Sequence, residues 1–457
     1  MPRTVFTTSH SFRPFQRLAT CTLMGACLVG APLGQLSAAS EDDLQQRIRQ
    51  LEDELVTARA ELEQAKESEQ AAKIASVSPK VQFKSDSLGT LKIGGATRVN
   101  YAIGDYGSAT GGPSRASGDS GNFELDTFRF NLDYENGPLI GKAEYRFYNG
   151  YNFLHTGWLG YNFEDESQVQ VGVNRVPFGP GPYGVSQSWF FDQHYYVGLS
   201  DDMDLGVKYA KPLGNWKFDL AYYYSDEGSY AGDSRDSARY SYDVVNETGS
   251  GYEERNQFNL RGVYDFPNTA VDTKLGFSLQ YGQLDSQGTQ KDGDHYAGSL
   301  HMVNKWNDWT LATQLTRYRY DVGANQPLGS DKLVQMGSYD WSGWAGQVAA
   351  EAWIPAVSLS YHQATPSIPW LDYVIPYIEY SSIEKSENTF NDSELFILGA
   401  AWARGGWFIY TDLAFSNGNT FVGNEGNNTA TACTNDFGKN CNHKWNTRFN
   451  VNFGYYF

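Results

Sequence analysis

The chain has 457 residues and a net charge of −18, and 15% of its residues are aromatic although its mean hydropathy is only −0.51. So acidic a chain is a poor match for a nucleic-acid partner. No run of 18 or more apolar residues follows the N-terminal segment, which excludes a transmembrane helix there. Many aromatic rings in a hydrophilic chain are typical of transmembrane β-barrels, which combine aromatic girdles with a polar interior and polar loops.

Residues 1–39 have the pattern of a secretory signal peptide. Three arginines precede an apolar run over residues 18–33, and small residues follow it, so we expect cleavage after Ala38 or Ala39. Cys27 offers a lipoprotein alternative, which is disfavoured because the apolar run continues past it. Cleavage removes three arginines and no acids, which changes the net charge from −18 to −21.

Residues 40–75 predict an amphipathic helix that begins at a Ser40 N-cap. Apolar residues follow at alternating spacings of four and three, namely at Leu44, Ile48, Leu51, Leu55, Ala58, Leu62 and Ala65. This heptad pattern favours a self-associating coiled coil over a single helix packed on a core, because the rest of each turn is polar. Residues 76–90 are interpreted as a linker to the region that follows.

From residue 91 onward, apolar and polar residues alternate with a period of two. One such segment has aromatic or apolar residues at Trp216, Phe218, Leu220, Tyr222 and Tyr224. The alternation predicts strands with one apolar and one polar face. We count 17 such segments, with residues 332–383 hard to divide; since single-chain bacterial barrels close with an even number of strands, we expect 16, or else 18.

The connections between these segments alternate in length. Tight turns such as 136–138 and 404–406 alternate with long polar loops such as 177–203 and 225–255. Short turns on one side and long loops on the other are typical of an outer-membrane barrel, whereas a β-sandwich follows no such rule. The sequence therefore predicts an all-β fold, an antiparallel transmembrane β-barrel over residues 91–457, in the outer membrane of a Gram-negative cell.

The last predicted strand, RFNVNFGYYF from Arg448 to Phe457, has an aromatic or apolar residue at every second position. The last strand of a barrel must offer both edges for pairing and an apolar row for lipid. Phe457 in this pattern is also similar to the C-terminal signal that Gram-negative barrels present to their assembly machinery. The pattern supports the class of protein and says nothing about its solute.

The residues between the apolar positions would face the lumen. The basic ones are Lys92, Arg98, Arg129, Lys142, Arg146, Lys208, Lys217, Arg261 and Lys274, and the acidic ones are Asp133, Glu144, Asp204, Asp219 and Glu379. Two interpretations remain open. The bases form a ladder that lowers the barrier for anions, or the wall is simply polar and its bases pair with neighbouring acids.

The predicted loop over residues 176–202 differs from the others. It begins with Pro and Gly residues, which disfavour a strand, and it contains more aromatic residues than a freely solvated loop would. We expect it to fold into the barrel and narrow it, with Trp189, Phe190, Asp192 and His194 as candidate constriction residues. An outer cap and a contact between subunits are the alternatives.

Two stretches resemble the phosphate-selective porin O/P family of Gram-negative outer-membrane porins. Val171-Gly-Val-Asn-Arg175 followed by Val176-Pro-Phe-Gly179 resembles a strand that leads into Pro-Phe-Gly, and the stretch from Phe123 to Phe130 resembles the family's second strand. The resemblance implies a trimeric, 16-stranded channel for small anions such as phosphate, or for other small solutes. The family's phosphate-selective members have denser rows of basic residues, whereas Thr127 and Phe128 precede Arg129 here.

Cys433 and Cys441 flank a short polar stretch, and in an oxidising compartment that spacing predicts a disulfide. The histidines show no metal-ligand spacing, and the acid-rich stretch 226–236 does not match a calcium loop, so we expect no metal and no cofactor. Ala414 stands where an outer-membrane phospholipase pattern requires a histidine base, so we expect no enzyme.

These features predict a porin, a homotrimer in contact with outer-membrane lipids that lets small hydrophilic solutes diffuse through a water-filled channel. The alternative is a structural anchor, in which the coiled coil over residues 40–75 engages peptidoglycan on the periplasmic side and the barrel only holds it in the membrane.

Overall fold

The computed structural model describes residues 81–105, 121–148, 151–227, 241–244, 251–267, 270–337, 346–423 and 436–457. The predicted signal peptide and coiled coil lie outside these ranges, as do residues 76–80 of the predicted linker. Within them, no helix is long and apolar enough to cross a membrane.

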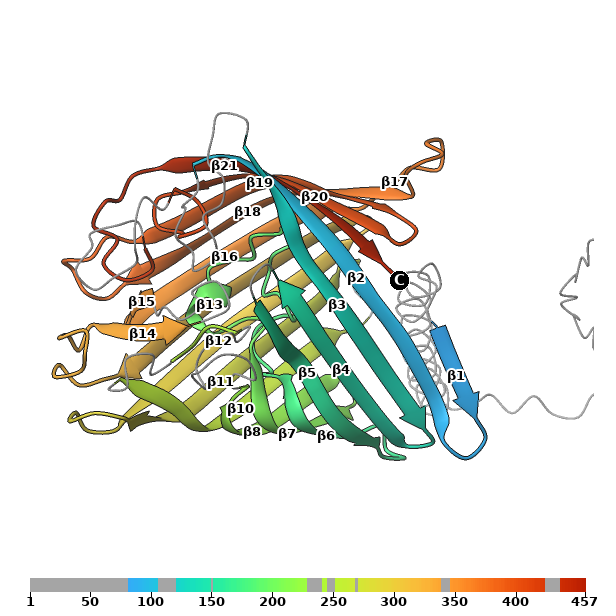
Figure 1. Cartoon of the computed structure of the whole chain (residues 1–457), viewed down its shortest axis with the longest axis horizontal. Helices are drawn as coiled ribbons and strands as arrows, with labels where there is room; N and C mark the ends of the chain where they lie inside the picture. Colours follow the sequence, from blue (N-terminus) through green and yellow to red (C-terminus); the bar gives the residue numbers. More distant parts are fainter. Residues whose placement is uncertain are drawn as a thin grey trace, which may run out of the picture. The chain divides into compact units, whose positions relative to one another are not determined.

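Sixteen antiparallel strands form a closed barrel, as the sequence predicts (Figure 1). The barrel strands are β2 (Gly89–Gly104), β3 (Asn122–Asn136), β4 (Leu139–Tyr148), β5 (Tyr151–Asn162), β6 (Gln168–Arg175), β7 (Met203–Leu213), β8 (Trp216–Asp226), β10 (Tyr252–Phe266), β11 (Asp272–Ser286), β12 (Gly293–Trp306), β13 (Trp309–Asp321), β16 (Glu351–Tyr361), β18 (Tyr373–Lys385), β19 (Ser393–Arg404), β20 (Trp407–Ser416) and β21 (Asn446–Tyr456). Each strand pairs with the next one along the chain, and β2 pairs with β21 to close the ring.

The seam between β2 and β21 explains the alternation of the last strand. Asn450 and Asn452 are fully buried on the inner face, where the Asn450 amide donates to Asn100 at 3.0 Å. Phe449 and Phe453, which flank this pair in the sequence, lie on the outer face and are each 38% exposed. Phe457 extends the pairing by one residue, since its N–H and C=O both bond to the backbone of Gly95.

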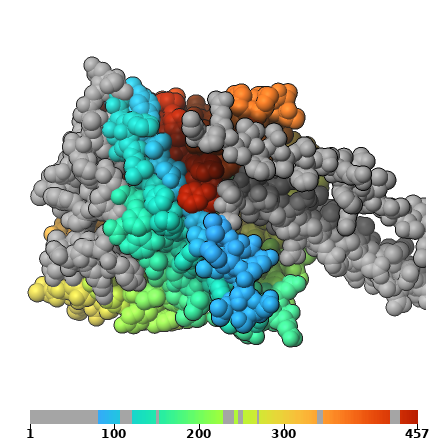
Figure 2. All heavy atoms as spheres, turned by 45° about the vertical axis from the view of Figure 1, so that its right-hand side comes forward, coloured from blue at the N-terminus to red at the C-terminus, as the bar shows by residue number. Residues whose placement is uncertain are grey.

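A short strand, β1 (Val81–Ser85), forms a hairpin with the start of β2, so part of the predicted linker is strand. Val81 and Phe83 alternate with polar residues, which suits an edge strand. Figure 2 shows β1 and the start of β2 in blue, next to the red end of β21; both β1 and β21 pair with the same edge of β2, one after the other along its length.

The region 332–383, which the alternation could not divide, contains elements of three kinds. Strands β14 (Leu333–Gly337) and β15 (Gly346–Ala349) form a small buried sheet with β9 (Asp243–Val244). Within the same region, Glu351–Tyr361 form a single barrel strand, β16, which continues through Pro355. The two-residue strand β17 (Gln363–Ala364) pairs with the start of β18.

The two faces of the barrel differ as the alternation predicts. On β11, Leu275 and Leu279 are 45% and 52% exposed on the outer face, whereas Ser278 and Gln280 are 0% and 5% exposed on the inner face. The connections also alternate, with short turns such as β7–β8 and β12–β13 at one end and long loops such as β6–β7 and β13–β16 at the other. The inner face is therefore polar, and the long loops emerge from one end of the barrel.

Gly172 in β6 has a backbone conformation and a close neighbour that a larger residue would not fit. Its φ of +129° is in a region that favours glycine, and a Cβ atom there would lie 2.3 Å from the Gly157 carbonyl oxygen. We expect Gly172→Ala to destabilise the folded barrel by about 1–3 kcal/mol. The unfolding temperature in detergent, followed by the heat-dependent shift in gel mobility, measures this effect.

Gly298→Ala in β12 is the matched control, because the nearest atom to its Cβ would be Leu279 Cδ2 at 3.7 Å. Equal unfolding temperatures for the two variants would contradict the prediction.

Candidate functional site

The loop that connects β6 and β7, residues 176–202, lies inside the ring of strands (Figure 1). It contains one short 3-10 helix, η1 (Tyr195–Val197), whose three residues are at most 2% exposed. The loop forms part of the main buried apolar cluster, and its polar groups bond to strands on several sides of the lumen. We call it the inward loop.

The start of the inward loop is held by the wall formed by β7, β10 and β11. Arg261 donates to the carbonyl oxygens of Gly179 at 2.7 Å and Pro180 at 3.1 Å. Ser278 accepts the Gly179 N–H at 3.0 Å. The Lys208 ammonium donates to the Arg175 carbonyl oxygen at 2.7 Å, just before the loop begins.

The middle of the inward loop is bound by two buried carboxylates from strands across the barrel. Glu379 on β18 accepts hydrogen bonds from the Ser186 hydroxyl at 2.7 Å and from the Gln187 N–H. Asp412 on β20 accepts the Trp189 N–H at 3.1 Å. Each carboxyl group is buried and accepts hydrogen bonds from the loop, so the two acids fix the position of its middle segment against β18 and β20.

The candidate constriction residues lie in this buried segment. His194 Nδ1 is 3.0 Å from Asp192 Oδ1, and its Nε2 is 2.8 Å from the Thr316 hydroxyl on β13. Asp192 also accepts the Val185 N–H at 2.8 Å. Asp192 therefore stabilises the fold of the loop itself, and His194 also joins the loop to β13.

The aromatic residues of the inward loop pack against other loops and against an arginine. Trp189 lies edge-on to Phe190, and Arg448 on β21 lies over both rings, 5.1 Å and 5.3 Å from their centroids. Tyr196 stacks on Phe437, whose centroid is 4.9 Å away. The rings therefore fill the space between the inward loop, β21 and the loop before β21.

The loop before β21 contains both cysteines of the predicted disulfide, Cys433 and Cys441. Cys441 is disulfide-bonded. Cys433 lies outside the described residues, so its pairing with Cys441 stays a prediction. Nearby, Asp436 accepts the N–H groups of Gly438 at 2.9 Å and Asn440 at 2.8 Å, and burial raises the pKa of its carboxyl.

Most of the predicted lumen bases have a carboxylate partner. The pairs are Lys92–Glu135 (3.3 Å), Arg98–Asp126 (2.5 Å), Arg129–Glu144 (3.2 Å), Lys142–Asp133 (3.9 Å), Arg146–Glu144 (2.6 Å) and Arg261–Asp219 (3.0 Å). Lys208 instead donates to the Arg175 carbonyl. This arrangement matches the interpretation in which bases pair with neighbouring acids, and it weakens the field that a row of isolated cations would produce.

Around Glu144, guanidinium groups outnumber carboxylates. Arg129 and Arg146 share the single carboxylate of Glu144. Arg448 on β21 donates to the Phe421 carbonyl at 2.9 Å and to Asn450 at 2.7 Å, which are both neutral. Arg448 is not among the predicted lumen residues, although it occupies a polar position of the last strand, where the same alternation places an inward-facing side chain.

The end of the inward loop has the opposite charge. Asp202 is 4% exposed, and burial, followed by the negative charges of Glu254 and Glu227, raises its pKa well above its usual range. The neighbouring Asp201 is paired with Arg175 at 2.6 Å. The lumen thus has a basic region near β2–β4 and β21 and an acidic region where the inward loop enters β7.

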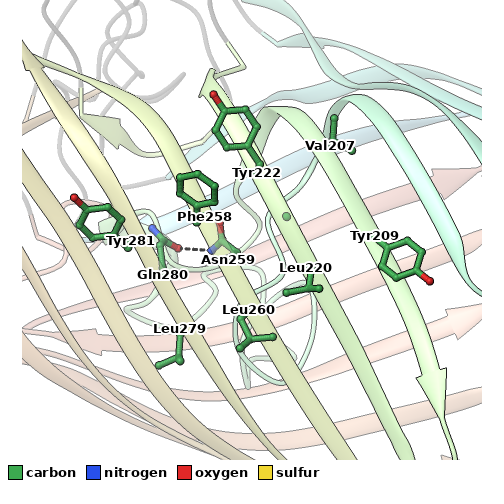
Figure 3. Close-up of a pocket in the computed structure, with 11 residues that line it drawn as sticks. Val207, Tyr209, Leu220, Tyr222, Phe258, Asn259, Leu260, Leu279, Gln280 and Tyr281 are labelled. Atoms are coloured by element: carbon green, nitrogen blue, oxygen red, sulfur yellow. Dashed lines mark hydrogen bonds between the residues drawn. The ribbon is translucent and has the colours of Figure 1, made fainter.

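An open groove of about 540 Å³ lies on the outer face over β7, β8, β10 and β11 (Figure 3). Most of its lining is apolar or aromatic, including Leu220, Phe258 and Leu279, which are 52%, 54% and 52% exposed. The polar residues at its base, Asn259 and Gln280, bond to each other at 3.0 Å. No polar groups converge in the groove, so it is not a site for a hydrophilic solute.

No protein-family model matches this sequence, and no curated protein matches it. The outer membrane channel DcaP of Acinetobacter baumannii is structurally similar, with a TM-score of 0.52 at 11% identity over 82% of this chain and 99% of that one. OmpT expressed in the outer membrane of Vibrio cholerae has a TM-score of 0.50 at 14% identity over 82% of this chain and 100% of that one.

A trimer form of in-vitro folded OmpT is similar to the same degree, with a TM-score of 0.50 at 15% identity over 80% of this chain and 99% of that one. At such identities the likeness concerns the fold. The chain has the 16-stranded barrel fold of outer-membrane porins and channels. The narrower resemblance to the phosphate-selective porin O/P family stays a prediction.

Loss of the Glu379 carboxylate should release the inward loop. Ser188 is 7% exposed, so a cysteine placed there should react slowly with a water-soluble maleimide. We expect Glu379→Ala to raise the labelling rate of Ser188→Cys at least about tenfold, since a loss of about 1.4 kcal/mol in loop binding suffices for that change. The rate is measured by mass spectrometry of folded protein in detergent.

Glu384→Ala is the control, because Glu384 lies on the same strand, is exposed and bonds to Ser382. If both alanine variants label at the wild-type rate, Glu379 does not hold the loop.

Proposed function

We propose that this protein is an outer-membrane channel through which small hydrophilic solutes diffuse passively. The observation that carries the proposal is the closed 16-stranded barrel with a polar inner face, an apolar outer face and a long loop folded inside. A polar interior around a partial obstruction suits a water-filled path with a narrow region. Small solutes rather than macromolecules would pass, because the inward loop occupies part of the lumen.

The outer face supports contact with lipid. Beside its exposed aliphatic residues, aromatic residues gather near the short turns, where Trp216 packs on Tyr264 and Trp407 on Tyr455, with centroids 5.1 Å and 4.9 Å apart. Trp309 is 39% exposed at a third short turn. Aromatic rings at one level of a barrel form the girdle that lies at a membrane interface.

We further propose a preference for small anions, with phosphate among the candidate solutes. The support is the wall on which Arg129 and Arg146 share one carboxylate, with Arg98 and Arg448 on neighbouring strands. The pairing of most other lumen bases limits the preference, so we expect it to be modest. No residue in this proposal acts in catalysis.

The proposed assembly is a homotrimer in the outer membrane of a Gram-negative cell, exported by the signal peptide over residues 1–39. The support is the fold, which a trimer form of OmpT of Vibrio cholerae shares. The heptad segment over residues 40–75 would either drive trimer formation or bind peptidoglycan. Both roles concern residues outside the described part of the chain.

Planar bilayer recordings test the channel function against the anchor alternative. We expect the purified protein to produce stepwise increases in conductance, and a variant that lacks residues 40–75 to produce steps as well, because the water-filled path lies in the barrel. Folded protein that inserts without any conductance steps would favour the anchor.

The reversal potential in a salt gradient tests the anion preference. We expect the wild type to favour anions and Arg98→Ala/Arg129→Ala to lower the ratio of anion to cation permeability at least about twofold, because Asp126 and Glu144 then lose cationic partners. Arg261 is left intact because it also binds the inward loop.

A variant with Lys84, Lys291 and Lys332 changed to Ala is the control, since all three are exposed. An unchanged reversal potential in the arginine variant, with normal conductance, would remove the basic wall from the proposal.

A further inference from the structure

Only a short part of the inward loop is exposed. The structure describes every residue of this loop, and the exposed ones are Pro182, Tyr183 and Gln187, with Tyr183 at 46%. The loop lies inside the ring of strands, so these residues face the lumen (Figure 1). Three of the four predicted constriction residues are at most 3% exposed, and the fourth, Trp189, is partly buried. A solute in the lumen would therefore contact Tyr183.

The Tyr183 side chain lies on the side of the inward loop that faces β3 and β4. Its ring centroid is 5.6 Å from the guanidinium carbon of Arg175. Its hydroxyl interacts electrostatically with the Arg175–Asp201 pair and, on the wall, with Arg146 on β4 and Arg129 on β3. A ring in this position narrows the space between the loop and the wall.

The ion pairs around this space expose their bases more than their acids. Side-chain exposure is 21% for Arg98 against 11% for Asp126, 19% for Arg129 against 8% for Glu144, and 33% for Arg175 against 1% for Asp201. The Arg261–Asp219 pair has no such bias, with 19% for each partner. A solute near Tyr183 would therefore meet guanidinium groups, because the carboxylates that partly neutralise them are more deeply buried.

The space is thus bordered by guanidinium groups on one side and by a tyrosine ring on the other. Guanidinium groups bind carboxylates through two parallel hydrogen bonds, and they attract other small anions as well. An aromatic ring adds contact with apolar surface, which a carboxylate with a hydrocarbon group offers and phosphate does not. Together the two surfaces favour an anion that has a charged end and an apolar face.

We propose that Tyr183 borders the narrowest part of the solute path and that, together with Arg98, Arg129 and Arg175, it favours small organic carboxylates over inorganic anions of the same charge. The inference rests on the proposed channel function and narrows its class of solute. It places the contact with solute at Tyr183 instead of the constriction residues expected from the sequence.

Cysteine modification tests the position of Tyr183. A small anionic methanethiosulfonate reagent should lower the single-channel conductance of Tyr183→Cys by about half or more, because it adds bulk and negative charge to the path. The controls are the wild type and Ser188→Cys, whose replaced side chain is only 7% exposed, and both should keep their conductance. Unchanged conductance in Tyr183→Cys, once mass spectrometry has shown that it is labelled, would contradict this position, as would an equal block of Ser188→Cys.

Reversal potentials with a different anion on each side of a bilayer test the class of solute. Benzoate and phosphate are compared at mildly acidic pH, where each carries a single negative charge. We expect the wild type to pass benzoate better than phosphate, and Tyr183→Ser to lower the benzoate-to-phosphate permeability ratio at least about twofold, because only benzoate loses a contact with the ring. Tyr183→Phe keeps a ring and should restore most of the ratio. Tyr296→Ser is the matched control, since Tyr296 is 45% exposed on the outer face of β12.

The outcomes distinguish this inference from the channel function on which it rests. A folded wild type that inserts without conductance would contradict the channel function itself. A conducting wild type that passes phosphate as well as benzoate, or a Tyr183→Ser variant with the wild-type ratio, would overturn the preference for organic carboxylates and leave the channel function standing.

Discussion

Closure of the hydrogen-bonded ring at the β2–β21 seam is the constraint on which the rest of the structure depends. Backbone groups that face lipid cannot be left unpaired, so a sheet in a membrane must have no free edge. Closure assigns alternate residues to opposite faces, and the inner row of β21 is polar while its outer row is aromatic. A closed ring of this size also encloses a space, which must be filled with water or protein.

The inward loop partly fills that space, and it does so through polar contacts as much as apolar ones. Its start bonds to Arg261, its middle to Glu379 and Asp412, and its end meets β7 and the small sheet. Each contact joins the loop to a different part of the wall. Because a buried charge without a partner is costly, these acids favour one position of the loop over others.

The lumen has two electrostatic regions. Arg129 and Arg146 share one carboxylate on β3 and β4, whereas acids gather where the inward loop enters β7. The chain as a whole is acidic, yet the wall that a solute would meet is mixed, so net charge is a poor guide to the selectivity of a barrel.

The sequence by itself determined the class of fold and the presence of an unusual loop over residues 176–202, whereas its 17 alternating segments led to 16 strands only through the rule that such barrels close with an even number. These features can be predicted because side-chain alternation, turn residues and aromatic content are properties of short stretches of sequence. Only the tertiary structure decided which side chains meet: Glu379 and Asp412 hold a loop that precedes them by about two hundred residues. Asp243 likewise joins Asp202 through a small sheet that no alternation predicts, because contacts across a barrel depend on register and loop path rather than on neighbouring residues.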